Sequence, residues 1–173
     1  MRLGYADPPY PGCAHMYKDH PDYAGEVDHV ALIRRLEAEF DGFVLHTNVP
    51  ALAMLLPLFT APVRVCAWVK PFAAFKANVP VAYTWEPVIV KALRKPDVAR
   101  SCVRPLRDHI AESITMERGL TGAKPEAVCW WAFEIAGLAA RDEMVDMFPG
   151  SGAVQRAWLS WGEQRNGLFG EAP

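Results

Sequence analysis

The chain has 173 residues, of which 51% are apolar and 22% charged, and its net charge is −2, as is typical of one globular domain. This composition excludes a disordered chain and a strongly basic nucleic-acid-binding protein, so any surface for nucleic acid is expected to be local. The most apolar stretch is interrupted by Pro50 and Pro57 and is too short to span a membrane, so we expect no membrane association.

The cysteines and histidines indicate the compartment and argue against a metal site. The four cysteines are far apart, form no C-x-x-C pair and follow no signal-like segment, which predicts reduced thiols in the cytoplasm. They are Cys13, Cys66, Cys102 and Cys129. His15 and His20 lack the i, i+4 spacing of helical metal ligands, so no metal site is predicted.

The first half of the chain alternates between strand and helix patterns. Residues 2–10 form a short apolar run ended by prolines, which predicts a buried parallel strand with a loop at its carboxyl end. Residues 28–40 place apolar side chains three and four apart after Asp28, which predicts a helix with that residue as N-cap. Composition and alternation predict three further strands and a short buried helix. The strands are expected at residues 42–48, 63–71 and 81–93, and the helix at residues 51–59.

The second half begins with a less regular stretch. Residues 94–122 have a higher charge density and no clear periodicity, which predicts an exposed connection or a small flap. A helix is predicted at 124–138, because Pro125 lies near its first turn and Gly137 near its end. A strand at 142–148, a glycine turn and a last helix at 153–161 complete the prediction.

Alternation of strands and helices predicts an α/β fold. We expect a Rossmann-like, doubly wound and mostly parallel sheet of about five strands, with helices on both faces. Residues 1–173 are expected to form one domain, with the functional loops at the carboxyl ends of the strands.

The stretch "DMFPGSG", residues 146–152, lies between a predicted strand and a predicted helix. Its glycines would let the backbone approach a ligand closely, and the helix N-terminus favours a carboxylate or phosphate. It is not a phosphate-binding loop of the Walker type, because no Gly-Lys-Ser/Thr follows. A tight strand-to-helix turn without a ligand is the alternative interpretation.

The stretch "DPPY", residues 7–10, follows the first predicted strand. Pro8 and Pro9 restrict the backbone and hold the carbonyls of Asp7 and Pro8 in a fixed direction. The Asp7 carboxylate and the Pro8 carbonyl offer two acceptors for one amine, and Tyr10 offers a ring for stacking. The pattern predicts a receptor for an amino-substituted heteroaromatic ring.

Together, "DPPY" and "FPGSG" resemble the signature motifs of S-adenosylmethionine-dependent amino-methyltransferases, the DNA adenine-N6 and cytosine-N4 enzymes. The catalytic motif comes first and the glycine motif last, which resembles the circularly permuted, β-type members. "GAKPEAV" is similar to the family's lysine-proline helix start beside the cofactor. The resemblance implies a permuted and shortened methyltransferase fold with S-adenosylmethionine as cofactor.

The resemblance also implies roles for individual residues. The base and its amine would be held by a catalytic group, which is Asp7, Pro8, Pro9 and Tyr10. The cofactor would be lined by a second group, which is Lys124, Pro125, Asp146, Phe148, Gly150, Ser151 and Gly152. No separate strong base is required, because the amine becomes acidic only after methylation.

Four further residues are candidates for substrate contact. Phe72 in a proline loop and Trp85 in "YTWEP" lie where the family has a hairpin beside the target base. His46 and Asn48 end the second predicted strand and either touch the substrate or cap the next helix. The loop at residues 13–29 either covers the bound base or is an ordinary surface loop.

The sequence departs from the family in two places. No further strand with an acidic ligand for the cofactor ribose is predicted after the glycine motif. The only room for a target-recognition region is residues 94–122, whose basic run either meets phosphates or is a solvated loop. Two copies could share a site by forming a homodimer.

We therefore expect methyl transfer from S-adenosylmethionine to an exocyclic amine of a nucleobase, with adenine N6 in DNA as the leading substrate. Two alternatives stay open. The first is methylation of a free nucleobase, nucleoside or similar small heterocycle, which the near-neutral charge favours. The second is a non-catalytic nucleic-acid-binding or scaffold subunit that keeps the fold.

Overall fold

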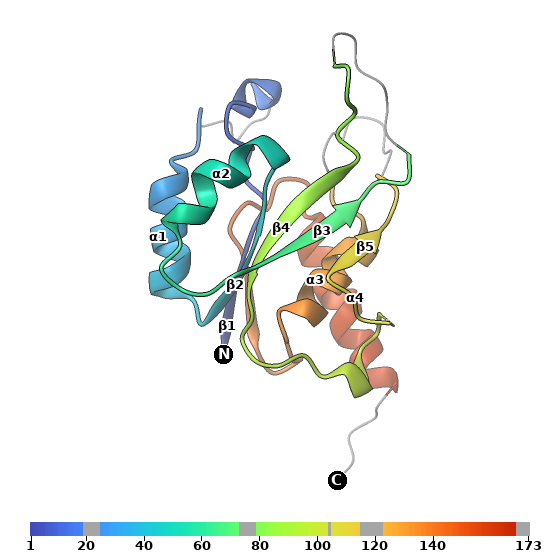
Figure 1. The fold of residues 1–173 in the computed structure, drawn as a ribbon. Helices are drawn as coiled ribbons and strands as arrows, with labels where there is room; N and C mark the ends of the chain where they lie inside the picture. The colour runs from blue at the N-terminus through green and yellow to red at the C-terminus, as the bar shows by residue number, and fades with distance from the viewer. Residues whose placement is uncertain (19–24, 73–78, 104, 115–122, 169–173) are drawn as a thin grey trace.

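The computed structural model describes residues 1–18, 25–72, 79–103, 105–114 and 123–168, and in it one sheet lies between two layers of helices (Figure 1). The strands are β1 (Arg2–Ala6), β2 (Gly42–His46), β3 (Arg64–Val69), β4 (Trp85–Lys91), β5 (His109–Ala111) and β6 (Glu143–Asp146). The α-helices are α1 (His29–Glu39), α2 (Leu52–Leu55), α3 (Glu126–Ile135) and α4 (Ala153–Leu168). The α/β class is thereby confirmed.

The sheet has six strands in the order β5-β3-β4-β2-β1-β6. The pairs β1–β2, β1–β6 and β3–β5 are parallel, whereas β4 runs antiparallel to both β2 and β3. Five of the six strands thus run in one direction, as expected for a mostly parallel sheet, but the described sheet has six strands instead of about five and β4 makes it mixed. The reason is the connection between β3 and β4, whose described residues, 70–72 and 79–84, form no crossover helix, and the chain returns antiparallel.

Two segments differ from their predicted form. Residues 94–122, expected as a connection or flap, also contain the short strand β5 at the sheet edge; three residues are too few for a periodic pattern to be recognised. The single helix predicted at 51–59 is divided into the 3-10 helix Val49–Ala51, α2, and the 3-10 helix Leu56–Leu58. Pro57 lacks the N–H that a continuous helix would need at that position.

The ends of several elements also differ from the prediction. The strand predicted at 2–10 ends at Ala6, and the strand predicted at 81–93 is confined to Trp85–Lys91. The last helix continues to Leu168 instead of ending at residue 161. The Asp28 N-cap of α1 is confirmed, since its carboxylate accepts a hydrogen bond of 2.9 Å from the Ala31 backbone N–H.

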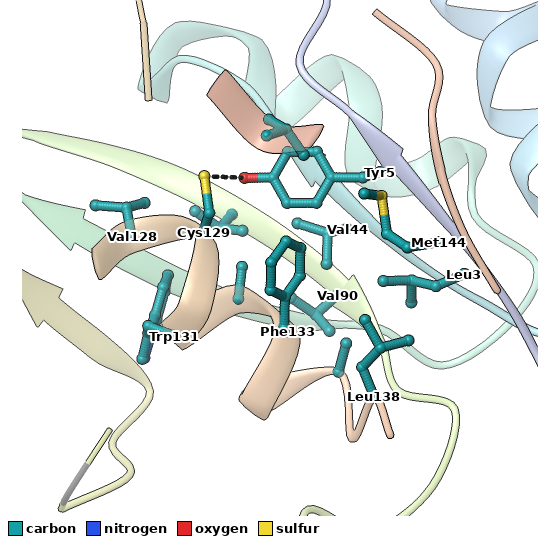
Figure 2. Packing of buried hydrophobic residues seen from close by; sticks show 14 of the residues in the cluster. Leu3, Tyr5, Val44, Val90, Val128, Cys129, Trp131, Phe133, Leu138 and Met144 are labelled. Atoms are coloured by element: carbon teal, nitrogen blue, oxygen red, sulfur yellow. Dashed lines mark hydrogen bonds between the residues drawn. The ribbon is translucent and has the colours of Figure 1, made fainter. Parts of the chain in front are cut away.

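Both faces of the sheet are buried. Successive side chains of a strand point to opposite faces, and helices cover each face (Figure 1). Leu3 and Tyr5 of β1 belong to the cluster that α3 and α4 cover, and Figure 2 shows Tyr5 beside Phe133 and Cys129 of α3. Ala6 belongs to the second cluster, on the face of α1 and α2 (Figure 1). At Gly4 the packing is so close that a Cβ would lie 2.9 Å from Leu36 Cδ2 of α1. Among the residues described, no helix has the length and apolarity needed to cross a membrane.

A buried carboxylate connects α3, α4 and the segment that precedes β5. Glu134 Oε1 accepts hydrogen bonds from Trp161 Nε1 at 2.8 Å, from Arg165 at 3.0 Å and from the Cys102 backbone N–H at 3.3 Å. The side chain of Glu134 is 2% exposed and that of Arg165 is 11% exposed. This ion pair therefore depends on the two helices remaining packed.

We predict that Glu134→Leu lowers the free energy of unfolding by about 3–5 kcal/mol, because it leaves the Arg165 guanidinium buried without its anion. Urea unfolding followed by circular dichroism measures this change. The exposed pair of Arg35 and Glu39 on α1 provides the control, since Glu39→Gln is expected to cost less than about 0.5 kcal/mol. Equal effects of both substitutions would contradict the role of the buried pair.

Candidate functional site

The two sequence motifs meet at the carboxyl edge of β1 and β6. These strands are adjacent and parallel, with Tyr5 opposite Asp146, so the chain leaves both at the same edge. The Met147 backbone N–H donates to the Tyr5 carbonyl at 2.9 Å, which continues the pairing beyond the strand. The helices α1 and α3, which connect β1 to β2 and β5 to β6, lie on opposite faces of the sheet (Figure 1). Ligands of open α/β sheets bind at such a switch point.

Lys124, two residues before α3, connects the loop after β1 to β4 electrostatically. It is 8% exposed, and its ammonium lies 2.9 Å from Asp7 Oδ1, 3.2 Å from the Tyr10 hydroxyl and 3.6 Å from Glu86 Oε2. The second oxygen, Asp7 Oδ2, has no hydrogen-bond partner within the described ranges, and the Asp7 side chain is 18% exposed. Asp7 can therefore accept a hydrogen bond from an additional donor.

The β3–β4 hairpin contributes the other wall of this cluster. Trp68 of β3 lies directly opposite Glu86 of β4 in the antiparallel register. Lys70 follows two residues after Trp68, so it continues on the same face, and it forms an ion pair with Glu86. The ammonium groups of Lys70 and Lys124 lie 4.9 and 5.4 Å from the centre of the Trp68 ring.

Sequence reasoning did not identify Glu86, Lys70 or Trp68 as site residues. A signal existed for Glu86, which is a charged residue at the start of the buried run "PVIV". It could not be interpreted from the sequence, because the partner of a strand residue depends on the pairing register.

The charges in this cluster perturb one another. Burial opposes the charged form of Lys124, but Asp7, Tyr10 and Glu86 outweigh it and hold the lysine pKa well above its ordinary value. Burial raises the pKa of Asp7, and Lys124 opposes this effect without cancelling it. Burial also disfavours the Glu86 carboxylate, yet Lys124, Lys70 and the Tyr10 hydroxyl lower its pKa overall. The cluster therefore brings two lysines together with two acidic side chains.

The glycine loop between β6 and α4 adopts backbone conformations that favour glycine. The φ angles of Gly150 and Gly152 are +43° and +72°, and the Gly152 N–H donates to the Pro149 carbonyl at 2.6 Å. The Ser151 carbonyl accepts a hydrogen bond of 2.9 Å from Arg156, so this carbonyl is already engaged.

Asp146, at the end of β6, has one satisfied and one unsatisfied oxygen. Oδ1 accepts a hydrogen bond of 3.1 Å from the Phe148 backbone N–H, whereas Oδ2 is buried with no partner among the described residues. Burial, together with the nearby charge of Asp7, raises the pKa of Asp146, and the Phe148 N–H only partly offsets this. A buried acceptor without a donor is costly, so the position favours a ligand that carries a donor.

The four candidate substrate residues are not brought to one place. His46 is fully buried and its Nε2 lies 2.7 Å from the Tyr5 hydroxyl; this hydroxyl also donates to Cys129 Sγ (Figure 2). Asn48 accepts a hydrogen bond of 3.0 Å from the Ala51 N–H and so caps the next 3-10 helix. Trp85 is half-buried at the start of β4, and Phe72 is 71% exposed on the hairpin.

The remaining predicted residues are located as follows. Pro8 and Pro9 lie in the loop after β1, and Pro125 precedes α3 with its carbonyl accepting from the Val128 N–H at 3.0 Å. Residues 19–24 of the loop predicted to cover the base, and residues 104 and 115–122 of the predicted recognition segment, lie outside the described residues.

No protein-family model and no curated protein matched this chain. Its function is therefore argued from the chemistry of the site.

We predict that Lys124→Met destabilises the protein more as the pH rises. Without the lysine, the raised pKa of Asp7 rises further, so the folded state retains a proton that the unfolded state releases. A carboxyl with a raised folded-state pKa stabilises the protein below its unfolded pKa, and this contribution is lost as the pH rises through the folded pKa. The deficit relative to wild type should be small near about pH 4 and reach roughly 3–5 kcal/mol at neutral pH.

Urea unfolding at several pH values measures this deficit, with Lys95→Met as the control for an exposed lysine. A deficit that is independent of pH would show that Lys124 does not hold the Asp7 charge.

Proposed function

We propose that this chain is an S-adenosylmethionine-dependent methyltransferase that acts on an exocyclic amine of a nucleobase, with adenine N6 in DNA as the leading substrate. The observation that carries the proposal is the juxtaposition of Asp7 and Tyr10 with the glycine loop at one edge of the sheet. The two motifs occupy opposite ends of the chain, and adjacent parallel strands bring their loops together. This arrangement supports a Rossmann-like fold with permuted motif order.

The free acceptors of the "DPPY" loop suit the chemistry of a ring-bound amine. The lone pair of such an amine is delocalised into the ring, which makes the nitrogen a poor nucleophile. Asp7 Oδ2 and the Pro8 carbonyl accept no hydrogen bond from any residue that the structure describes. Acceptors placed on the amine hydrogens favour a pyramidal nitrogen and stabilise the positive charge that develops on it.

The glycine loop and Asp146 fit S-adenosylmethionine, which when bound supplies an electrophilic methyl group on a sulfonium. The unpartnered Asp146 Oδ2 suits the ammonium of the methionine portion. Gly150 has no side chain, and a Cβ built there would meet no atom nearer than the Phe148 carbonyl oxygen at 3.7 Å, so a ligand can approach the backbone at this position. Lys124 contacts Asp7 and Tyr10 directly, so it belongs to the amine side of the site.

A target base in duplex DNA would have to leave the helix before its amine could reach Asp7. The hairpin beside the site exposes Phe72, Val81 and Tyr83, which are 71%, 76% and 60% exposed. Of these, Phe72 and Tyr83 carry aromatic rings, which stack on bases. The four cysteines are free of disulfides, which supports the proposal of a reducing, cytoplasmic location.

We predict that Asp7→Asn lowers kcat by at least about 100-fold, because the amide cannot stabilise the charge that develops on the amine. The dissociation constant of the cofactor should change less than about twofold, since Asp7 acts on the substrate side. The assay incubates the protein with methyl-labelled cofactor and unmethylated DNA, digests the product to nucleosides and quantifies methylated adenine and cytosine. Asp41→Asn, at an exposed site, is the control.

The same assay separates the alternatives. Transfer to free nucleosides, without transfer to DNA, would favour the small-molecule enzyme. Full activity of Asp7→Asn would show that the opening motif has been misinterpreted.

We also predict that Asp146→Asn weakens S-adenosylmethionine binding by about 10- to 100-fold, because a hydrogen bond to a charged group is lost. Without cofactor the variant should be at least as stable as wild type at neutral pH, since the raised pKa of Asp146 indicates an unfavourable buried charge. Titration calorimetry and urea unfolding provide the two measurements. If neither S-adenosylmethionine nor S-adenosylhomocysteine binds wild-type protein, the non-catalytic alternative is supported.

A further inference from the structure

Glu86 is a half-buried carboxylate outside the two motifs assigned to the base and the cofactor. It lies at the start of β4 with its side chain 16% exposed, and the two carboxylate oxygens have different partners. Oε1 pairs with Lys70, while Oε2 accepts a hydrogen bond of 2.6 Å from the Tyr10 hydroxyl. The carboxylate thus connects the β3–β4 hairpin to the loop that follows β1.

Tyr10 needs such a partner, because regular secondary structure does not hold its loop. Residues 7–12 lie outside the strands and helices, so the ring direction depends on contacts of the side chain. The hydroxyl is bonded both to Glu86 and to Lys124, the latter at 3.2 Å. A ring fixed at its far end presents a constant face for stacking, which lowers the entropy cost of binding a second ring.

Lys70 affects how Lys124 is shared between Asp7 and Glu86. Glu86 and Asp7 are both within reach of Lys124, but the distance to Asp7 is 2.9 Å and the distance to Glu86 is 3.6 Å. Because Lys70 pairs with the other oxygen of Glu86, Lys124 stays nearer Asp7. Two carboxylates with one cation between them would instead compete for it.

The hairpin that carries Glu86 is itself held at the sheet edge. Trp68, opposite Glu86, donates its indole N–H to the Glu112 carbonyl at 2.7 Å, just beyond β5. The Lys70 backbone N–H donates to the Thr84 carbonyl at 2.7 Å and closes the ladder on this side. Glu86 therefore stands on paired strands, whereas Tyr10 and Asp7 stand on a loop.

We propose that Glu86 is a positioning residue, which orients the Tyr10 ring for stacking on the target ring and, with Lys70, keeps Lys124 beside Asp7. The part that concerns the target ring rests on the proposed function, whereas the orientation of Tyr10 does not. Glu86 acts through Tyr10 and Lys124 and makes no contact with the reacting atoms.

The first test observes Tyr10 directly and requires no substrate. The protein contains five tyrosines, so labelling them with carbon-13 at the ζ position gives few signals, and Tyr10→Phe identifies that of Tyr10. Burial raises the pKa of Tyr10 and the Glu86 charge raises it further, so Glu86→Gln should displace this signal and lower the pH at which Tyr10 ionises. An unchanged signal and titration would overturn the proposal.

Glu39→Gln is the matched control, because it makes the same chemical change at an exposed glutamate that pairs with Arg35 on α1. The Tyr10 signal should not move in this variant. If it moves as far as in Glu86→Gln, the effect is not specific to the contact and the proposal is wrong.

The second test measures methyl transfer to unmethylated DNA. Glu86→Gln should raise KM for DNA about tenfold while leaving the cofactor dissociation constant unchanged, and Tyr10→Phe should have a similar effect. In the double variant of Glu86→Gln and Tyr10→Phe the two increases in KM should not add, since each substitution removes the same hydrogen bond between Tyr10 and Glu86. Additive effects would overturn the positioning role.

The two tests also separate this inference from the proposed function. If wild-type protein transfers no methyl group to DNA or nucleosides, the proposed function fails and the Tyr10 signal alone decides the role of Glu86. Should Glu86→Gln fail to fold, Lys70→Gln replaces it in the comparison with Tyr10→Phe, because it removes the cation that pairs with the other oxygen of Glu86.

Discussion

The burial of the Lys124 ammonium is the constraint on which the site depends. A cation at this depth requires anions, because an unpaired buried charge would cost more than the fold can supply. Asp7 provides one from the loop after β1 and Glu86 provides the other from β4, and Tyr10 adds a hydroxyl. The start of α3, the loop after β1 and the β3–β4 hairpin are therefore held together by electrostatic attraction as well as by apolar packing.

This arrangement connects the stability of the fold to the proposed chemistry. Burial raises the pKa of Asp7 and the Lys124 cation opposes this, while the second oxygen of Asp7 is left for another donor. Asp146 shows the opposite condition, a buried oxygen with no partner in the described structure. Polar groups that are incompletely satisfied destabilise the free protein, and such groups are concentrated where ligands bind. Both unsatisfied acceptors lie at the edge where β1 and β6 end.

Local signals predicted much of the secondary structure. The N-cap at Asp28, the proline before α3 and the glycine loop before α4 each act within a few residues, so they can be recognised without knowledge of the fold. The antiparallel β4 and the edge strand β5 could not be predicted in this way, because strand direction and partner depend on contacts between distant segments. For the same reason His46, expected near a substrate, lies in the interior against Tyr5.

The sequence by itself determined the two chemically distinctive loops, an acidic-proline-proline-aromatic turn and a glycine turn, since both depend on the backbone limits of proline and glycine. Only the tertiary structure decided that these loops are neighbours, that Lys124 pairs with Asp7 of the first loop, and that Glu86, Lys70 and Trp68 complete the cluster. The reason is the alternation of side chains along paired strands. It places a residue on one face or the other only after the register of the sheet is set.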